Sequence, residues 1–201
     1  LAGVTAARRL PCTLGATSGS MRIVILCGLP GVGKLTIADG LARAYGYRVF
    51  HNHLVFDAVE ALFSFGTAPF VELRARLWVE LLCRAVQERV GDVAFTVARD
   101  RGVDAAFLGK LVTELTRLGA DVCCIELTCD DEDLEHRVAS AERAKFGKIQ
   151  SAARYRELRA AGAFPLFSLP PGTITVDTSG LSVPQAVASV AARLNHAPRA
   201  T

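Results

Sequence analysis

Apolar runs of strand length alternate with segments of helical periodicity from residue 21 onward. Short, nearly unbroken apolar runs predict buried strands at 23–27, 47–50, 93–98, 122–127 and 173–176. Apolar residues that recur every three or four positions predict helices at 37–45, 54–63, 70–90, 104–118, 130–143 and 183–194. Because strands and helices alternate along the chain, the pattern predicts a three-layer α/β/α fold with a five-stranded, mainly parallel sheet.

The link between the first strand and the first helix carries the strongest chemical signal. Residues 28–36 read GLPGVGKLT, which follows the phosphate-loop (Walker A) pattern G-x-x-x-x-G-K-[ST] at every position but one. The glycines allow backbone angles closed to other residues, so successive amides can converge on one anion, and the lysine adds a full positive charge. The candidate nucleotide contacts are Gly28, Pro30, Gly31, Val32, Gly33, Lys34, Leu35 and Thr36.

Leu35 is the departure from this pattern. The motif places a hydroxyl there as a magnesium ligand, and leucine has no oxygen. Thr36 lies about 100° further around the helix, so it cannot simply replace that ligand. The third strand also lacks a carboxylate at its end, since Ala98 and Arg99 precede Asp100. Asp57 and Asp100 are the candidate Mg²⁺ ligands, and Arg99 is an alternative contact for a substrate phosphate.

Length and composition limit the remaining possibilities. The 201 residues suffice for one α/β domain, predicted at 21–196, with 197–201 as a tail. A hydrophobic share of 51% without a long uncharged run argues against a membrane span, and a net charge of +3 is too balanced to indicate nucleic-acid binding. Six cysteines without metal spacing favour reduced thiols in a cytoplasmic protein over a disulfide framework.

Residues 1–20 contain Arg8 and Arg9 but no acidic residue, and they predict a disordered extension. The only methionine, Met21, stands directly before the first strand. An over-extended start with initiation at Met21 is the preferred interpretation, and a transit peptide is the alternative.

At this point the chain resembles the P-loop NTPases of the nucleoside monophosphate kinase and shikimate kinase group. The resemblance is carried by Gly28 to Thr36, by LEHRV at 134–138 with the basic stretch after it, and by ITVDTSGLSVPQAV at 174–187. It implies an ATP-dependent kinase that uses Mg²⁺ and transfers a phosphoryl group to a small hydroxylated metabolite or nucleotide. A monomer or homodimer without nucleic-acid or membrane partners fits this reading.

The resemblance also implies where the acceptor binds. In such kinases it lies beyond the second strand, where this chain has His51, Asn52, His53 and Asp57. A histidine or carboxylate there could orient a hydroxyl group or take its proton, so His51, His53 and Asp57 join Lys34 as catalytic candidates. Two other interpretations stay open: Asn52 or His53 caps the next helix, or the two histidines bind a metal.

The basic stretch after the fifth predicted helix resembles the mobile lid of these kinases. The resemblance implies that Arg137 lies near the nucleotide base and that Arg143 or Lys145 acts on the phosphates during transfer. A solvated basic helix face is the alternative. A nucleotide-binding or regulatory module without efficient phosphotransfer is the second functional class, whereas the short chain argues against an ATPase of the AAA type.

Overall fold

A computed structural model describes residues 20–100, 102–138, 151–165 and 167–195. The sheet has five strands in the order β2-β3-β1-β4-β5, and all neighbouring strands are parallel. The predicted sheet is therefore confirmed. Its strands are β1 (Arg22–Gly28), β2 (Arg48–His51), β3 (Val93–Ala98), β4 (Asp121–Thr128) and β5 (Ile174–Asp177).

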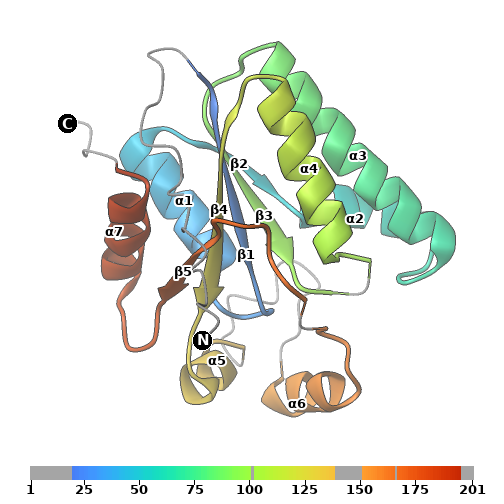
Figure 1. Cartoon of the computed structure of the whole chain (residues 1–201). Coiled ribbons are helices and arrows are strands. Elements are labelled where there is room, and N and C mark those ends of the chain that lie inside the picture. The colour runs from blue at the N-terminus through green and yellow to red at the C-terminus, as the bar shows by residue number, and fades with distance from the viewer. Residues whose placement is uncertain (1–19, 101, 139–150, 166, 196–201) are drawn as a thin grey trace, which may run out of the picture.

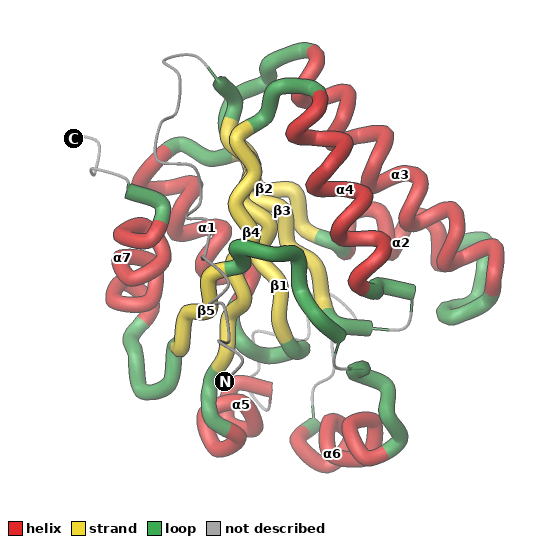
Figure 2. Tube along the Cα trace, viewed as in Figure 1, coloured by secondary structure: helices red, strands yellow, loops and turns green. Residues whose placement is uncertain are grey.

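Helices cover both faces of this sheet (Figures 1 and 2). One buried cluster joins the sheet to α1 (Lys34–Tyr45) and α7 (Val183–Arg193). The other cluster joins it to α2 (His53–Glu60), α3 (Ala68–Gln87) and α4 (Ala105–Arg117). The two remaining helices, α5 (Asp131–Val138) and α6 (Ala152–Ala160), lie beyond the carboxyl ends of the strands.

The central strand explains why the sheet forms as it does. In β1, every residue from Ile23 to Gly28 is buried, as expected for a parallel strand that is covered on both faces. Side chains alternate between the two clusters, so Val24 and Leu26 pack toward α1 while Ile23 and Ile25 pack toward α3 and α4. Continuous hydrophobicity thus directs this strand to the centre of the fold.

Helix α6 is not among the helices that the sequence predicts. The helix predicted at 70–90 begins earlier, at Ala68, and Pro69 lies in its first turn, where the missing amide costs nothing. Helix α5 is described only as far as Val138, so the predicted continuation to Arg143 lies outside the described residues, as do residues 1–19 and 196–201.

Within the described part of the chain, no helix combines the length and apolar character needed to cross a bilayer. The five cysteines in this part, Cys27, Cys83, Cys123, Cys124 and Cys129, are all free thiols. Burial raises the pKa of Cys27 to about 11, and the neighbouring Glu126 carboxylate adds to this effect. The Cys27 thiol is therefore a packing group of the strand and not a nucleophile.

Candidate functional site

The loop that follows β1 has the backbone that its glycines predict. Gly28, Gly31 and Gly33 all adopt positive φ, at 143°, 105° and 94°. A Cβ on Gly28 would stand 2.4 Å from the backbone oxygen of Leu127 in β4, so this position has room for no side chain. The chain therefore turns tightly over the end of the sheet and enters α1 at Lys34.

The start of α1 is arranged to receive an anion. The N-cap residue, Gly33, has no side chain, so it makes no capping hydrogen bond to the first-turn amides. The Lys34 ammonium group lies beside the loop and donates to the backbone oxygens of Gly28 at 3.0 Å and Leu29 at 2.8 Å. Loop amides, helix terminus and ammonium group together form a positively polarised cradle for phosphate groups.

The described residues around the loop form no ready-made metal cluster. Leu35 is half-buried in the pocket wall and Thr36 is exposed beside it. Among the described residues, no group of three or more His, Cys, Asp or Glu side chains is placed to hold a metal. Asp57 and Asp100, the predicted ligands, are not brought together in such a group.

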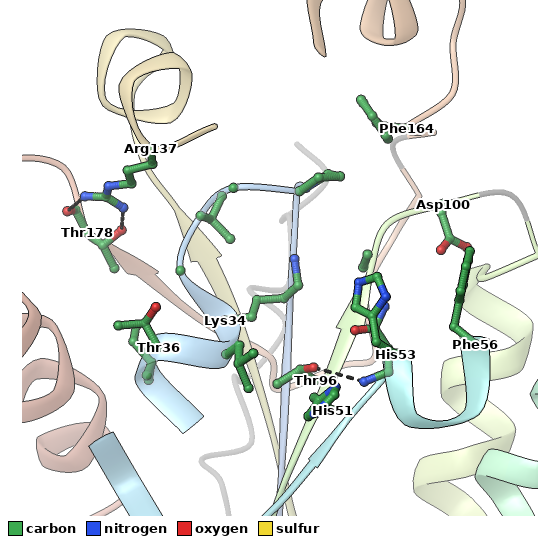
Figure 3. A pocket seen from close by; sticks show the side chains of 18 of the residues that line it. Lys34, Thr36, His51, His53, Phe56, Thr96, Asp100, Arg137, Phe164 and Thr178 are labelled. Carbon is green, nitrogen blue, oxygen red and sulfur yellow. Dashed lines mark hydrogen bonds between the residues drawn. The ribbon is translucent and has the colours of Figure 1, made fainter. Parts of the chain in front are cut away.

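The loop opens into a single pocket of about 1310 Å³ at the carboxyl ends of the strands, as expected for a parallel α/β sheet (Figure 3). Its wall includes Lys34 and Thr36 from α1, His51 at the end of β2, His53 at the start of α2, and Asp100 after β3. A cavity of this size accommodates a nucleotide and a second small molecule together. The structure thus brings most of the predicted site residues into one place.

Beside the loop, the polar groups that follow β2 are fixed by β3. His51 pairs with Thr96 across the two strands, and the Asn52 amide donates to the Thr96 hydroxyl at 3.3 Å. Asn52 is also the N-cap residue of α2, but its side chain makes no capping bond. The sequence prediction missed Thr96, because an isolated threonine in an apolar strand gives no signal of its own.

His53 and Asp57 occupy one face of α2. The His53 Nδ1 atom lies 3.5 Å from the Asp57 carboxylate, which is 60% exposed. His53 lines the pocket, whereas Asp57 is absent from the lining. Asp57 therefore lies beside His53, next to the pocket lining.

Asp100 occupies the pocket edge just after β3. Its carboxylate accepts two hydrogen bonds from Arg74 of α3, at 2.9 and 3.2 Å. Arg74 is fully buried, with its guanidinium over the rings of Phe70 and Trp78. Burial raises the pKa of Asp100, and the nearby Arg74 charge opposes that rise. Asp100 is thus a carboxyl of increased basicity at the pocket wall.

The side chain of the preceding residue, Arg99, contacts other parts of the protein. It donates to Glu126 of β4 at 2.5 Å and to the Phe167 backbone oxygen at 3.0 Å, and it stacks over the Phe167 ring. Arg99 is buried and is absent from the pocket lining. In this arrangement it fastens the segment between α6 and β5 to the sheet.

Arg137 of α5 lies on the opposite side of the pocket, as Figure 3 shows. It donates to the Thr178 hydroxyl at 2.9 Å, to the Thr178 backbone oxygen at 2.8 Å and to Asp133 at 3.1 Å. The Thr178 hydroxyl in turn donates to the backbone oxygen of Thr128. Arg137 therefore joins α5 to the turn after β5, where the resemblance expects the nucleotide base.

The lid side of the pocket is described in part. Arg143, Lys145 and Lys148 lie outside the described residues. Helix α6 contributes Arg154 to the pocket, and Phe164 follows it. The sequence did contain a signal for this helix, namely a serine before it and a glycine after it. In the structure, the Ser151 hydroxyl accepts a capping bond from the Arg154 amide, and Gly162 has a φ of 68°.

The strand order, the phosphate loop and the pocket define the chain as an α/β protein with a P-loop fold. Solved structures share this fold. They include a sugar kinase from Janibacter sp. HTCC2649, which is 17% identical with a TM-score of 0.59, where the match covers 89% of this chain and 96% of the other. A gluconokinase from Sinorhizobium meliloti 1021 is 16% identical with a TM-score of 0.55, over 87% and 91% of the two chains.

The tunicamycin resistance protein of Deinococcus radiodurans is 22% identical with a TM-score of 0.59, over 90% of this chain and 99% of the other. No family model matches the chain. No curated protein matches it either. Likeness at these identities shows the fold alone.

Proposed function

We propose that the chain is an ATP-dependent kinase of the nucleoside monophosphate kinase and shikimate kinase type. It would transfer the γ-phosphoryl group to a small hydroxylated metabolite or nucleotide. One observation carries this proposal: the phosphate loop with Lys34 shares a single pocket with the polar groups after β2 and β3. The folds of a sugar kinase and a gluconokinase support it.

Each part of the pocket has a role in this reaction. The loop amides and Lys34 hold the ATP phosphates, and Arg137 lies beside the base. The acceptor oxygen attacks the γ-phosphorus, the bond from that phosphorus to the bridging oxygen breaks, and ADP leaves. His51, His53 or Asp100 takes the proton of the acceptor hydroxyl, and the raised pKa of Asp100 suits it to this step. Arg143 would act on the phosphates from the lid.

Magnesium would enter this site with the nucleotide. Phosphate oxygens and water would supply most of its ligands, because Leu35 offers no oxygen. Asp100 is the carboxylate in the pocket that could reach it through water.

The variant Lys34→Ala tests the nucleotide site, and Lys110→Ala is its matched control, since Lys110 lies exposed on α4 outside the pocket. We expect Lys34→Ala to abolish ATP binding in isothermal titration and the control to retain it. ATP-to-ADP conversion should be slow alone and faster with an acceptor. Normal ATP affinity in Lys34→Ala would refute the site.

A nucleotide-binding module without efficient turnover is the second candidate function, and Leu35 is the observation that favours it. The variant Leu35→Ser discriminates between the two. If the new hydroxyl strongly increases magnesium-dependent turnover of ATP, then leucine weakens catalysis in the natural site. Loss of an existing acceptor-dependent rate would identify a kinase specialised for leucine at this position.

A further inference from the structure

Charges are unevenly distributed over the pocket lining. Its described cationic residues include Lys34, Arg43, Arg137 and Arg154, which come from α1, α5 and α6, and α1 also contributes Asp39. We call the lining residues at 51–65 and 96–100 the acceptor side, because they follow β2 and β3. Within the described lining this side has two carboxylates, Glu60 and Asp100, and no lysine or arginine.

The guanidinium group of Arg74 does not change this balance. It is fully buried, both of its terminal nitrogens donate to Asp100, and it is absent from the pocket lining. Its charge is therefore committed to a carboxylate of the protein. The Asp100 charge is in turn balanced by Arg74. A carboxylate or phosphate on the acceptor would therefore meet Glu60, with no arginine or lysine among the described lining residues of the acceptor side.

The acceptor side also presents aromatic rings. The Phe56 ring lies 5.4 Å from His53 and 5.6 Å from Phe65, and Phe70 supports both phenylalanines edge-on from beneath, at 5.1 and 5.4 Å. Phe70 is fully buried, whereas Phe65 is 48% exposed. Phe56 and Phe65 thus form an apolar wall that is supported by Phe70 and open to the pocket. A flat ring can stack on such a surface.

We infer that the acceptor is an uncharged hydroxyl compound that carries a flat apolar ring, such as an aryl glycoside or a nucleoside. This inference rests on the proposed function for its phosphotransfer step. The ring packs against Phe56 and Phe65, and this places a hydroxyl group of the same molecule toward Asp100 and Lys34. Figure 3 shows Phe56, His53 and Asp100 on the same side of the pocket, facing Lys34.

Two matched pairs of probes test the inference at pH 8, where an ordinary histidine is uncharged. Phenyl and methyl β-glucoside differ in the ring, and uridine and uridine 5′-monophosphate differ in charge. Binding is measured by titration in the presence of ADP, and transfer by ATP-to-ADP conversion. We expect the phenyl glucoside to bind about fivefold more tightly than the methyl glucoside, and uridine about tenfold more tightly than its monophosphate.

Variants connect these preferences to the named residues. Phe56→Leu should remove the preference for the phenyl glucoside, and Glu60→Lys should reverse the preference for uridine over its monophosphate. Leu62→Ala is the control, because Leu62 is 80% exposed and outside the pocket lining. It should retain both preferences.

The binding and transfer measurements separate the two proposals. Tight binding of the uncharged ring compounds without transfer supports the inferred ligand class and refutes the kinase function. Tighter binding of the monophosphate, equal binding of the two glucosides or no binding of either uncharged ring compound overturns the inferred class. Transfer to another acceptor in that case leaves the kinase function standing.

Discussion

The ion pair between Arg99 and Glu126 gives the sharpest test of how the pocket is held together. Arg99 is one residue from Asp100, and its side chain is 7% exposed while that of Glu126 is 22% exposed. Glu126→Gln keeps the shape of the side chain but removes its negative charge. The Arg99 guanidinium then stays buried with only the Phe167 carbonyl, the Phe167 ring and a neutral amide around it.

The structure sets the size of the effect. Removal of one partner from a buried pair costs about 3–5 kcal/mol, and the partial exposure of Glu126 places the expected loss of unfolding free energy at the lower end, about 3 kcal/mol. For a domain of this length that loss lowers the melting temperature by about 6–12 °C. Urea and thermal unfolding, followed by circular dichroism, measure both quantities.

A matched control comes from α4. Glu114 pairs with Arg117 at 2.9 Å, but both side chains are exposed, so Glu114→Gln should cost less than about 0.5 kcal/mol. The double variant Arg99→Met with Glu126→Gln should recover part of the loss, since no buried charge is then left unpaired. If Glu126→Gln is no more destabilising than Glu114→Gln, then Arg99 does not depend on this pair and is free for another role, such as contact with a substrate phosphate.

Three further predictions concern the site itself. If Asp100 accepts the proton of the acceptor hydroxyl, turnover should fall as the pH drops through the raised pKa of Asp100. Arg74→Gln should move that fall to higher pH, because the positive charge that lowers this pKa is then gone. An unchanged acid limb of the pH–rate profile would exclude this role. Gly28→Ala should weaken ATP binding at least about tenfold, because its Cβ would meet the Leu127 oxygen at 2.4 Å, and unaltered affinity in titration would contradict this. The Cys27 thiol, with a pKa of about 11, should react with iodoacetamide at pH 8 more slowly than Cys83 or Cys129. Mass spectrometry of the labelled peptides measures these rates, and preferential labelling of Cys27 would contradict its burial.

How much the sequence could predict depended on whether a feature is local. The phosphate loop is a continuous segment, so the sequence predicted its position and the positive φ of its glycines. The buried strands were equally clear, because a covered parallel strand such as β1 is apolar along its buried part, from Ile23 to Cys27. Helix α6 was missed because only Tyr155 of its residues is buried, which leaves no apolar stripe to detect.

The supporting contacts of the site could not be predicted in this way. Arg74 and Asp100 are 26 residues apart, and Arg99 and Glu126 are 27 apart. Their pairing follows from the packing of α3 and from the register of the sheet, which no local pattern encodes. The sequence therefore raised a phosphate contact for Arg99 and a magnesium ligand for Asp100, while the structure engages both with partners in the protein.

The charge distribution in the pocket bears on how a kinase with this loop would limit the hydrolysis of ATP in the absence of an acceptor. Phosphates would be attracted to the side with Lys34, and the Glu60 carboxylate would disfavour the phosphates of a second nucleotide on the other side. With Leu35 supplying no metal ligand, an ATP molecule bound alone would have little to activate a water molecule against it. An acceptor stacked on Phe56 would supply the hydroxyl group and displace that water molecule. Phosphoryl transfer to the acceptor would then be favoured over hydrolysis of ATP by water.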